Sequence, residues 1–135
     1  MGKRERDKGS NYERIVRDKL KRAFPTQHIA RGNQRFQAWQ PDVVCPIYWV
    51  ECTHSKSPRI NAKIKQAIRD INQTPDPDQK LKVPLIVSRQ DRGKDWATIP
   101  LEHLIDLIIR AEERSSSPHE EVTSPTTTYK PTLDT

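Results

Sequence analysis

The sequence has no long hydrophobic run, which argues against a membrane protein. None of its apolar stretches approaches the roughly 18 residues that a transmembrane helix requires. The residues after Met1 are mostly charged and lack the apolar segment of a signal peptide, and Arg6 stands where a myristoylation signal has Ser or Thr. We therefore expect no membrane partner and a cytoplasmic location, which for a viral protein means the host cytoplasm.

Cysteine is also scarce, and its scarcity argues against two kinds of small domain. Cys45 and Cys52 are too few for a disulfide framework in a chain of 135 residues. With no CxxC pair and four scattered histidines, the sequence does not favour a structural zinc site either. The length and the 33% hydrophobic content fit one small folded domain.

Positive charge is in excess and is unevenly distributed. Residues 1–110 carry 22 basic and 13 acidic side chains, whereas residues 111–135 carry 2 and 5. A basic body in the cytosol favours a polyanionic partner, usually nucleic acid, although an ordinary solvated basic surface has the same composition.

Composition divides the chain into three parts. Residues 114–135 are rich in Ser, Thr and Pro and hold too few apolar side chains to fold, so we expect a disordered tail. Residues 1–9 are charged and have no apolar residue after Met1, which predicts a flexible basic arm. The folded domain is expected to span residues 10–113.

Hydrophobic periodicity predicts an α/β domain. Amphipathic helices are expected over residues 11–24, 59–72 and 101–113. Strands are expected over residues 28–31, 42–45, 47–53, 83–88 and 96–99. The order α-β-β-β-α-β-β-α predicts a mixed central β-sheet flanked by helices.

Two carboxylates occupy strand positions that are hard to explain structurally. Asp42 opens one predicted strand, and Glu51 lies near the end of the next, on the same face as Trp49. If Asp42 and Glu51 meet across a hairpin, a divalent cation relieves their repulsion most simply. Magnesium suits such a site, with the main-chain carbonyl of Cys52 as a further ligand and manganese as an alternative ion. Phosphodiester hydrolysis is the reaction that this arrangement suits.

Glu13 is a third carboxylate in an unexpected place. It falls at about 160° on the wheel of the first predicted helix, inside the apolar arc. A carboxylate on that side is costly unless the protein uses it. The alternative is a capping-box role, because Glu13 stands three residues after Ser10.

These residues resemble the signature of the PD-(D/E)xK nucleases. Pro41-Asp42 is followed, nine residues after Asp42, by Glu51-Cys52-Thr53, and Glu13 is similar to the third acid of many members. Over about residues 9–109, the order of elements most resembles the small Holliday-junction resolvases of archaea and phages. The resemblance implies a restriction-endonuclease-like core in which Asp42 and Glu51 bind magnesium and Glu13 binds it directly or through water.

The sequence departs from this family at Thr53, where members usually carry a catalytic lysine. Threonine can hold a water molecule but supplies no positive charge. Lys56 is our preferred substitute, with Lys63 or Lys65 from the second predicted helix as alternatives. Alternatively, Thr53 orients the attacking water and the metal alone stabilises the charge in the transition state. A further alternative is that the protein binds DNA without cutting it. Each lysine can equally contact phosphate without a catalytic role.

Other basic residues near this site are expected to hold DNA. The loop of residues 31–40 directly precedes Asp42 and carries basic and aromatic side chains that can contact a backbone or stack on an opened base. Arg14 adjoins Glu13 on the outer side of its helix. The predicted DNA-binding residues are Arg14, Arg31, Arg35, Lys63 and Lys65.

The resemblance implies a magnesium-dependent endonuclease that resolves four-way DNA junctions by paired hydrolysis. Because a junction has two-fold symmetry, we expect a homodimer, with residues 101–113 and the strand at Trp96 as candidate interfaces. The alternatives are a nicking, repair or restriction-type nuclease of the same fold and a DNA-binding module that does not cleave.

Overall fold

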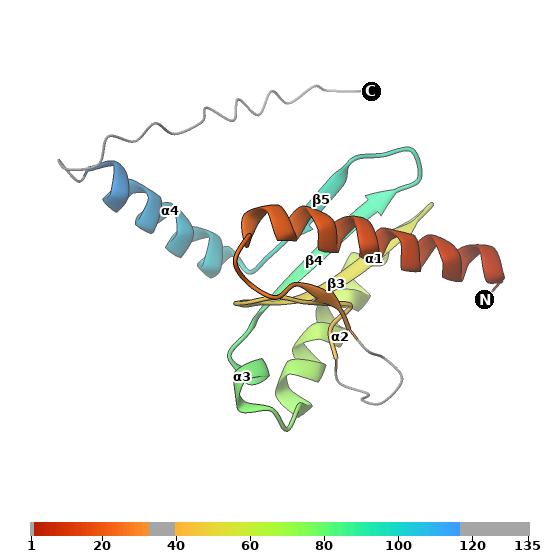
Figure 1. Cartoon of the computed structure of the whole chain (residues 1–135), viewed down its shortest axis with the longest axis horizontal. Coiled ribbons are helices and arrows are strands. Elements are labelled where there is room, and N and C mark those ends of the chain that lie inside the picture. The colour runs from red at the N-terminus through yellow and green to blue at the C-terminus, as the bar shows by residue number, and fades with distance from the viewer. Residues whose placement is uncertain (1, 33–39, 117–135) are drawn as a thin grey trace.

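The computed structural model describes residues 2–32 and 40–116, and within them it shows an α/β fold (Figure 1). This confirms the predicted fold class, and the predicted order gains one short helix, α3. In chain order the elements are α1 (Lys3–Ala23), β1 (Ala30–Arg31), β2 (Val43–Val44), β3 (Tyr48–Ser55), α2 (Ile60–Gln73), α3 (Pro77–Lys80), β4 (Val83–Gln90), β5 (Asp95–Thr98) and α4 (Leu101–Ser115).

The five strands form one mixed sheet in the order β1-β2-β3-β4-β5. β3 and β4 pair in parallel, with Glu51 opposite Ile86, and the other neighbouring strands pair antiparallel. The antiparallel pairing of β2 with β3 confirms the predicted hairpin, in which Val43 lies opposite Val50. α2 and α3 provide the long connection that a parallel pair requires.

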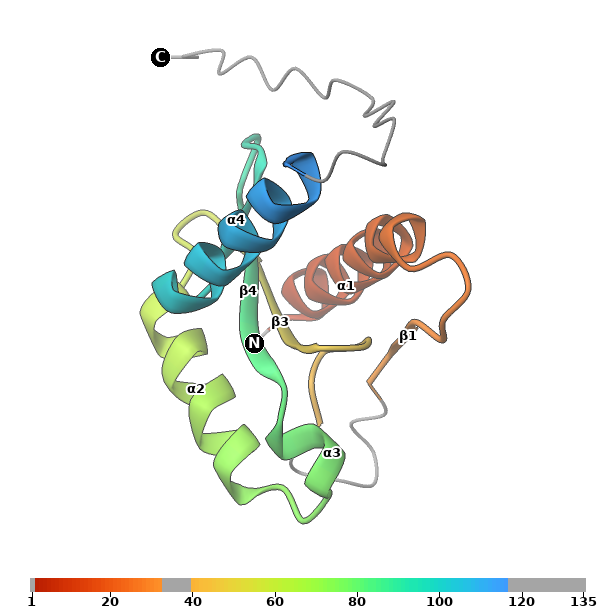
Figure 2. The same cartoon turned by 90° about the vertical axis from the view of Figure 1, so that its left-hand side faces the viewer.

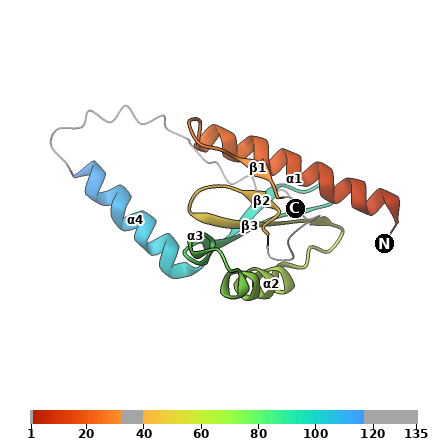
Figure 3. The same ribbon diagram turned by 60° about the horizontal axis from the view of Figure 1, so that its bottom comes forward.

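Helices cover both faces of the sheet, as Figures 2 and 3 show for α1 and α2. On the α1 face, Tyr12 and Val16 pack against Val50 and other strand residues. On the α2 face, Ala67 and Ile71 pack with Trp49 and Ile86. The odd and even residues of β3 therefore enter different halves of the core, as strand alternation predicts.

α1 is longer than predicted. It begins at Lys3, so the expectation of a flexible arm over residues 1–9 and of a cap at Ser10 is wrong for the residues that the structure describes. Lys, Arg and Glu, which fill this segment, are good helix formers. A distant contact also holds the first turns, because Lys8 Nζ lies 2.6 Å from Asp91 Oδ1 in the β4–β5 turn.

α4 extends the predicted helix by two residues and projects from the rest of the domain (Figures 1 and 3). Arg114 and Ser115 thus belong to this helix and not to the predicted tail, whose residues 117–135 lie outside the described part of the chain. Within residues 2–32 and 40–116, no helix combines the length and the apolar character needed to cross a bilayer.

Candidate active site

Asp42 is fixed by backbone hydrogen bonds on both sides of its strand. Its amide donates to the carbonyl of Val50 at 2.9 Å, and its carbonyl accepts from the amide of Gly32 at 3.0 Å. The chain at Gly32 runs so close that a Cβ there would lie 1.9 Å from the carbonyl oxygen of Pro41. Only glycine permits this approach, which brings β1 against the segment that carries Asp42.

Glu51 is buried in the middle of β3, with 1% of its surface exposed. Its Oε1 accepts a hydrogen bond of 3.0 Å from the indole Nε1 of Trp49. This contact confirms that Trp49 and Glu51 share a face. Among the described residues, Glu51 Oε2 is one of two buried side-chain atoms that receive no hydrogen bond. A buried carboxylate oxygen without a donor is costly, so it is a candidate ligand atom.

Asp42 and Glu51 meet across the hairpin. Asp42 Oδ2 accepts a hydrogen bond of 2.9 Å from the amide of Cys52, the residue that follows Glu51. Burial, the charge of Asp42 and a hydrogen bond with the Asp42 carboxyl group together raise the pKa of Glu51 to about 9. Such a bond needs a proton shared between the two groups, and this proton is absent when both are ionised. The two carboxyl groups therefore form a pair that holds either a proton or a cation.

Glu13 lies near this pair but has a partner of its own. Its Oε2 accepts hydrogen bonds from Arg31 Nε at 3.0 Å and Arg31 Nη2 at 2.7 Å. Burial raises the pKa of Glu13, the hydrogen bond with Arg31 opposes this shift, and the charge of Asp42 adds to it. Asp42 thus acts electrostatically on both other acids. The ion pair explains why a carboxylate is tolerated on the core-facing side of α1.

The residues present fit a divalent cation held by two carboxylates. Within the described segments, no group of three or more His, Cys, Asp or Glu side chains is arranged to hold a metal ion. Asp42 and Glu51 alone supply the negative charge, the unsatisfied Glu51 Oε2 and the oxygen donors that Mg²⁺ prefers. Magnesium usually keeps several waters and uses one or two carboxylates. Glu13 would join only after leaving Arg31 or through a water.

Lys63 of α2 supplies positive charge that acts on both Glu51 and Glu13, in addition to the Arg31 partner of Glu13. Its charge lowers the pKa of Glu13, of Glu51 and of the buried Cys52 thiol, which burial itself raises. Lys56, our preferred substitute from the sequence, is exposed beyond the end of β3. Thr53 is half-buried on β3, opposite Ser88 of β4. Lys63 is therefore better placed than Lys56 to act electrostatically on Glu51.

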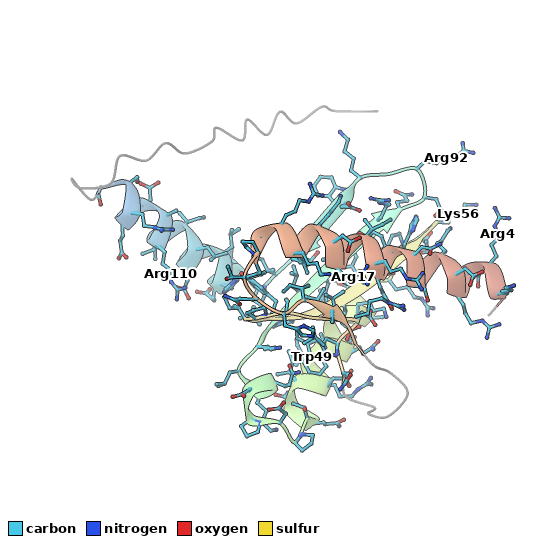
Figure 4. The ribbon with its side chains drawn as sticks, viewed as in Figure 1. Arg4, Arg17, Trp49, Lys56, Arg92 and Arg110 are labelled. Atoms are coloured by element: carbon cyan, nitrogen blue, oxygen red, sulfur yellow. The ribbon has the colours of Figure 1, made fainter. Side chains whose placement is uncertain are left out.

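A cleft of about 670 Å³ opens beside the acid pair. Cys52 and Lys63 line the cleft, Cys52 also contacts Asp42 through its amide, and the charge of Lys63 acts on Glu51, whereas the two buried acids are not themselves among the lining residues. The cleft is predominantly basic, and Figure 4 shows Lys56 at the same end of the molecule as Arg4 and Arg92. Its lining residues are Glu5, Lys8, Cys52, Thr53, His54, Ser55, Lys56, Ser57, Arg59, Lys63 and Asp91.

The other predicted DNA-binding residues have different surroundings. Arg14 is exposed on α1, where its Nη1 donates to Asn11 Oδ1 at 3.0 Å, and Lys65 is exposed on α2. Arg31 is engaged with Glu13, as described above. Arg35 lies in residues 33–39, outside the described part of the chain.

Two basic residues of the cleft, Lys8 and Arg59, did not emerge from the sequence. The sequence prediction places Lys8 in a flexible arm, although Lys8 stands four residues before Tyr12 and so on the same side of a continuous helix. This spacing is the sequence feature that could have identified Lys8 as part of the helix. Arg59 precedes α2 with no pattern that sets it apart from other surface arginines.

Comparisons with protein-family models, curated proteins and solved structures found no match to this chain.

Proposed function

We propose that this protein is a metal-dependent DNA endonuclease, and more specifically that it resolves four-way junctions with Mg²⁺ or Mn²⁺. The observation that carries the proposal is the buried Asp42–Glu51 pair, with its unsatisfied Glu51 Oε2, next to Cys52, which lines a basic cleft. A protein that used these residues only for stability would gain by replacing them with apolar side chains. The PD-(D/E)xK resemblance of the same residues supports the proposal.

Asp42 and Glu51 would hold the cation, with the Cys52 carbonyl as a further oxygen donor. When bound, a divalent cation supplies charge stabilisation to phosphoryl oxygens and acidifies a coordinated water. The ammonium of Lys63 offsets charge that develops on the phosphate. The hydroxyl of Thr53, in the same cleft as Lys63, can orient a water. Glu51, Cys52 and Thr53 stand on β3 and Lys63 on α2, and Asp42 directly precedes β2, which favours fixed positions for these groups.

The basic side chains of the cleft would hold the DNA backbone. Lys8, Lys56 and Arg59 line it together with Lys63, against two acidic residues. These residues come from α1, from the end of β3 and from the start of α2. Such contacts supply affinity for phosphate without base specificity, as expected for an enzyme that selects DNA structure over sequence. A junction has two symmetric cleavage points, so the proposal includes two copies of the chain.

Thr53 favours a second candidate function, a DNA-binding module that does not cleave. The hydroxyl of threonine cannot replace the charge of the usual lysine. A nicking, repair or restriction-type nuclease is a further alternative within the first proposal, because the same site would serve those substrates.

A cleavage assay on three substrates separates these functions. A synthetic four-way junction, a linear duplex and a flap of matched sequence are incubated with the protein and Mg²⁺ or Mn²⁺. Paired symmetric nicks in the junction support a resolvase, and preferential cutting of the duplex or flap supports the other nuclease types. Tight junction binding without cleavage in either metal supports the binding module.

A further inference from the structure

α4 is attached to the domain by its polar side. All fifteen residues of this helix are described, none is buried, and His103 is the most covered of them. His103 Nε2 lies 2.7 Å from the hydroxyl of Tyr48, and the two rings meet edge to face with centroids 5.2 Å apart. The charge of Arg110 also reaches Tyr48. The helix therefore turns a polar stripe toward its own sheet.

The apolar side of α4 consequently faces away from the domain. Its large apolar residues span an arc of about 200° on a helical wheel, and His103 lies about 140° from the centre of that arc. Each of these side chains is between 36% and 66% exposed. An amphipathic helix normally buries this side, so another surface is needed to cover it. The residues are Leu101, Leu104, Ile105, Leu107, Ile108 and Ile109.

An apolar hollow lies at the base of the same helix. Its volume is about 230 Å³, and Thr98 is the one polar residue among those that line it. Trp96 stands two residues before Thr98 on the same face of the edge strand β5 and is 62% exposed. The hollow is lined by Ile64, Ile68, Pro84, Ile86, Thr98, Ile99 and Pro100.

A second copy of the chain fits these two features best. The chain carries both a projecting apolar helix and an apolar hollow, which is the self-complementarity that a two-fold interface requires. With Trp96 and Ile68, the apolar side chains of α4 expose on the order of 800 Å² per chain, the area that each partner of a standard interface buries.

The charges of α4 argue against a lipid surface as the occupant. The helix carries four acidic and two basic side chains, whereas helices that lie on membranes are rich in Lys and Arg on their polar side. The same acidic balance disfavours nucleic acid.

We propose that α4 is a dimerisation helix whose apolar side seats in the hollow of a second copy, with the reciprocal contact related by a two-fold axis. This assignment names the contact surface for the two copies that the proposed function includes, but it rests on exposed apolar surface and its test measures mass, so the two proposals can fail separately.

The test is the molar mass of the full chain by light scattering or sedimentation equilibrium. The wild type is expected to be a dimer at micromolar concentration, and the double variant Leu104→Glu/Ile108→Glu and the hollow variant Ile68→Glu should each weaken the dimer at least about 100-fold. Asp106→Lys, on the polar side of α4, is the matched control and should remain dimeric. Far-ultraviolet circular dichroism checks that each variant keeps its helices.

Mixing the two disrupted variants tests the reciprocal arrangement. A chain with a damaged helix retains its hollow, and a chain with a damaged hollow retains its helix, so the mixture should recover heterodimers through one intact contact. A wild type that stays monomeric would overturn the proposal, and binding of that monomer to lipid vesicles would assign the apolar side to a membrane surface instead. An Ile68→Glu variant as dimeric as the wild type would also overturn it, because α4 would then pair without the hollow.

Discussion

Asp42 accepts a hydrogen bond from the backbone amide of Cys52, the residue that follows Glu51, at 2.9 Å. The bond draws the carboxyl group of Asp42 toward β3, beside the carboxyl group of Glu51. Two buried acids held this close cannot both ionise cheaply. The pair therefore lowers stability unless a proton or a cation offsets its charge, and the proposed cation site and several of the predictions below follow from this.

Glu51→Gln should stabilise the protein in the absence of metal. Because the pKa of Glu51 is raised to about 9 in the folded state, the folded protein binds more protons than the unfolded chain. The stability that this proton provides is complete below the unfolded pKa of roughly 4.3 and is lost as pH rises toward 9. The side chain of a glutamine at this position can accept a hydrogen bond from Trp49 and donate one to Asp42 at any pH.

We therefore expect Glu51→Gln to raise the free energy of unfolding by on the order of 2 kcal/mol at pH 8, and much less at pH 5. Urea titrations of both proteins at the two pH values, with a chelator present, measure this. Equal stability of the two proteins at pH 8 would mean that Glu51 is ionised without cost.

Lys63→Ala should impair cleavage far more than Lys56→Ala. The charge of Lys63 acts on both Glu13 and Glu51, whereas Lys56 is exposed beyond the strand. We expect Lys63→Ala to lower the single-turnover rate by about 100-fold and Lys56→Ala to lower it less than about 10-fold. Lys56→Ala should instead weaken junction binding and reduce its salt dependence. The reverse order of rates would restore Lys56 as the substitute lysine.

Gly32→Ala should destabilise the protein and displace Asp42. A Cβ at Gly32 would overlap the carbonyl oxygen of Pro41, a backbone atom that cannot move aside alone. We expect a loss of about 1–3 kcal/mol in the free energy of unfolding. Gly9→Ala is the control, since a Cβ at Gly9 has open space within α1 and should stabilise by about 0.5–1 kcal/mol. Thermal denaturation measures the change in stability of each variant relative to the wild type. Equal changes in the two variants would contradict the close backbone approach at Gly32.

Asp95 should make a large contribution to acid sensitivity. Burial alone would raise its pKa, but hydrogen bonds from Arg89, Lys19 and Tyr12 hold the pKa well below its usual range. Arg89 binds both carboxylate oxygens, at 2.7 and 2.9 Å. A depressed pKa gives stability that is complete above the unfolded pKa of roughly 3.9 and is lost as pH falls further.

Asp95→Asn should therefore cost about 1–3 kcal/mol at pH 7 and flatten the loss of stability between pH 4 and pH 2. Asp91→Asn is the control, because Asp91 forms only exposed ion pairs with Lys8 and His54 and should change stability little. Urea titrations across this pH range measure both variants. If Asp95→Asn loses as much stability between pH 4 and pH 2 as the wild type, the network around Asp95 does not control acid unfolding.

The periodicity of the sequence predicts the fold class and the shared face of Trp49 and Glu51, because both depend on local geometry. Strand alternation places these two side chains on one face whatever the rest of the chain does, and the structure joins them by a hydrogen bond. The spacing of Ala67 and Ile71 likewise determined the buried side of α2.

Contacts between distant segments could not be predicted in this way. Lys8 of α1 meets Asp91 in a turn 83 residues away. Glu13 was recognised as unusual, but its partner Arg31 belongs to another element. Nearness to Thr53 in the sequence favours Lys56 over Lys63, whereas the charge that acts on Glu51 in the structure is that of Lys63, because it depends on how α2 lies against the acids.

The most direct test of the proposed site is cleavage of a four-way junction by Glu51→Gln beside the wild type, in Mg²⁺ and in Mn²⁺. Removing the charge of this ligand should lower the cleavage rate at least about 1,000-fold, because the cation site depends on both carboxylates. Junction binding should be kept or strengthened, since one negative charge near the phosphates is lost. A Glu51→Gln variant that cuts the junction as fast as the wild type would contradict the assignment of Asp42 and Glu51 as the catalytic metal site.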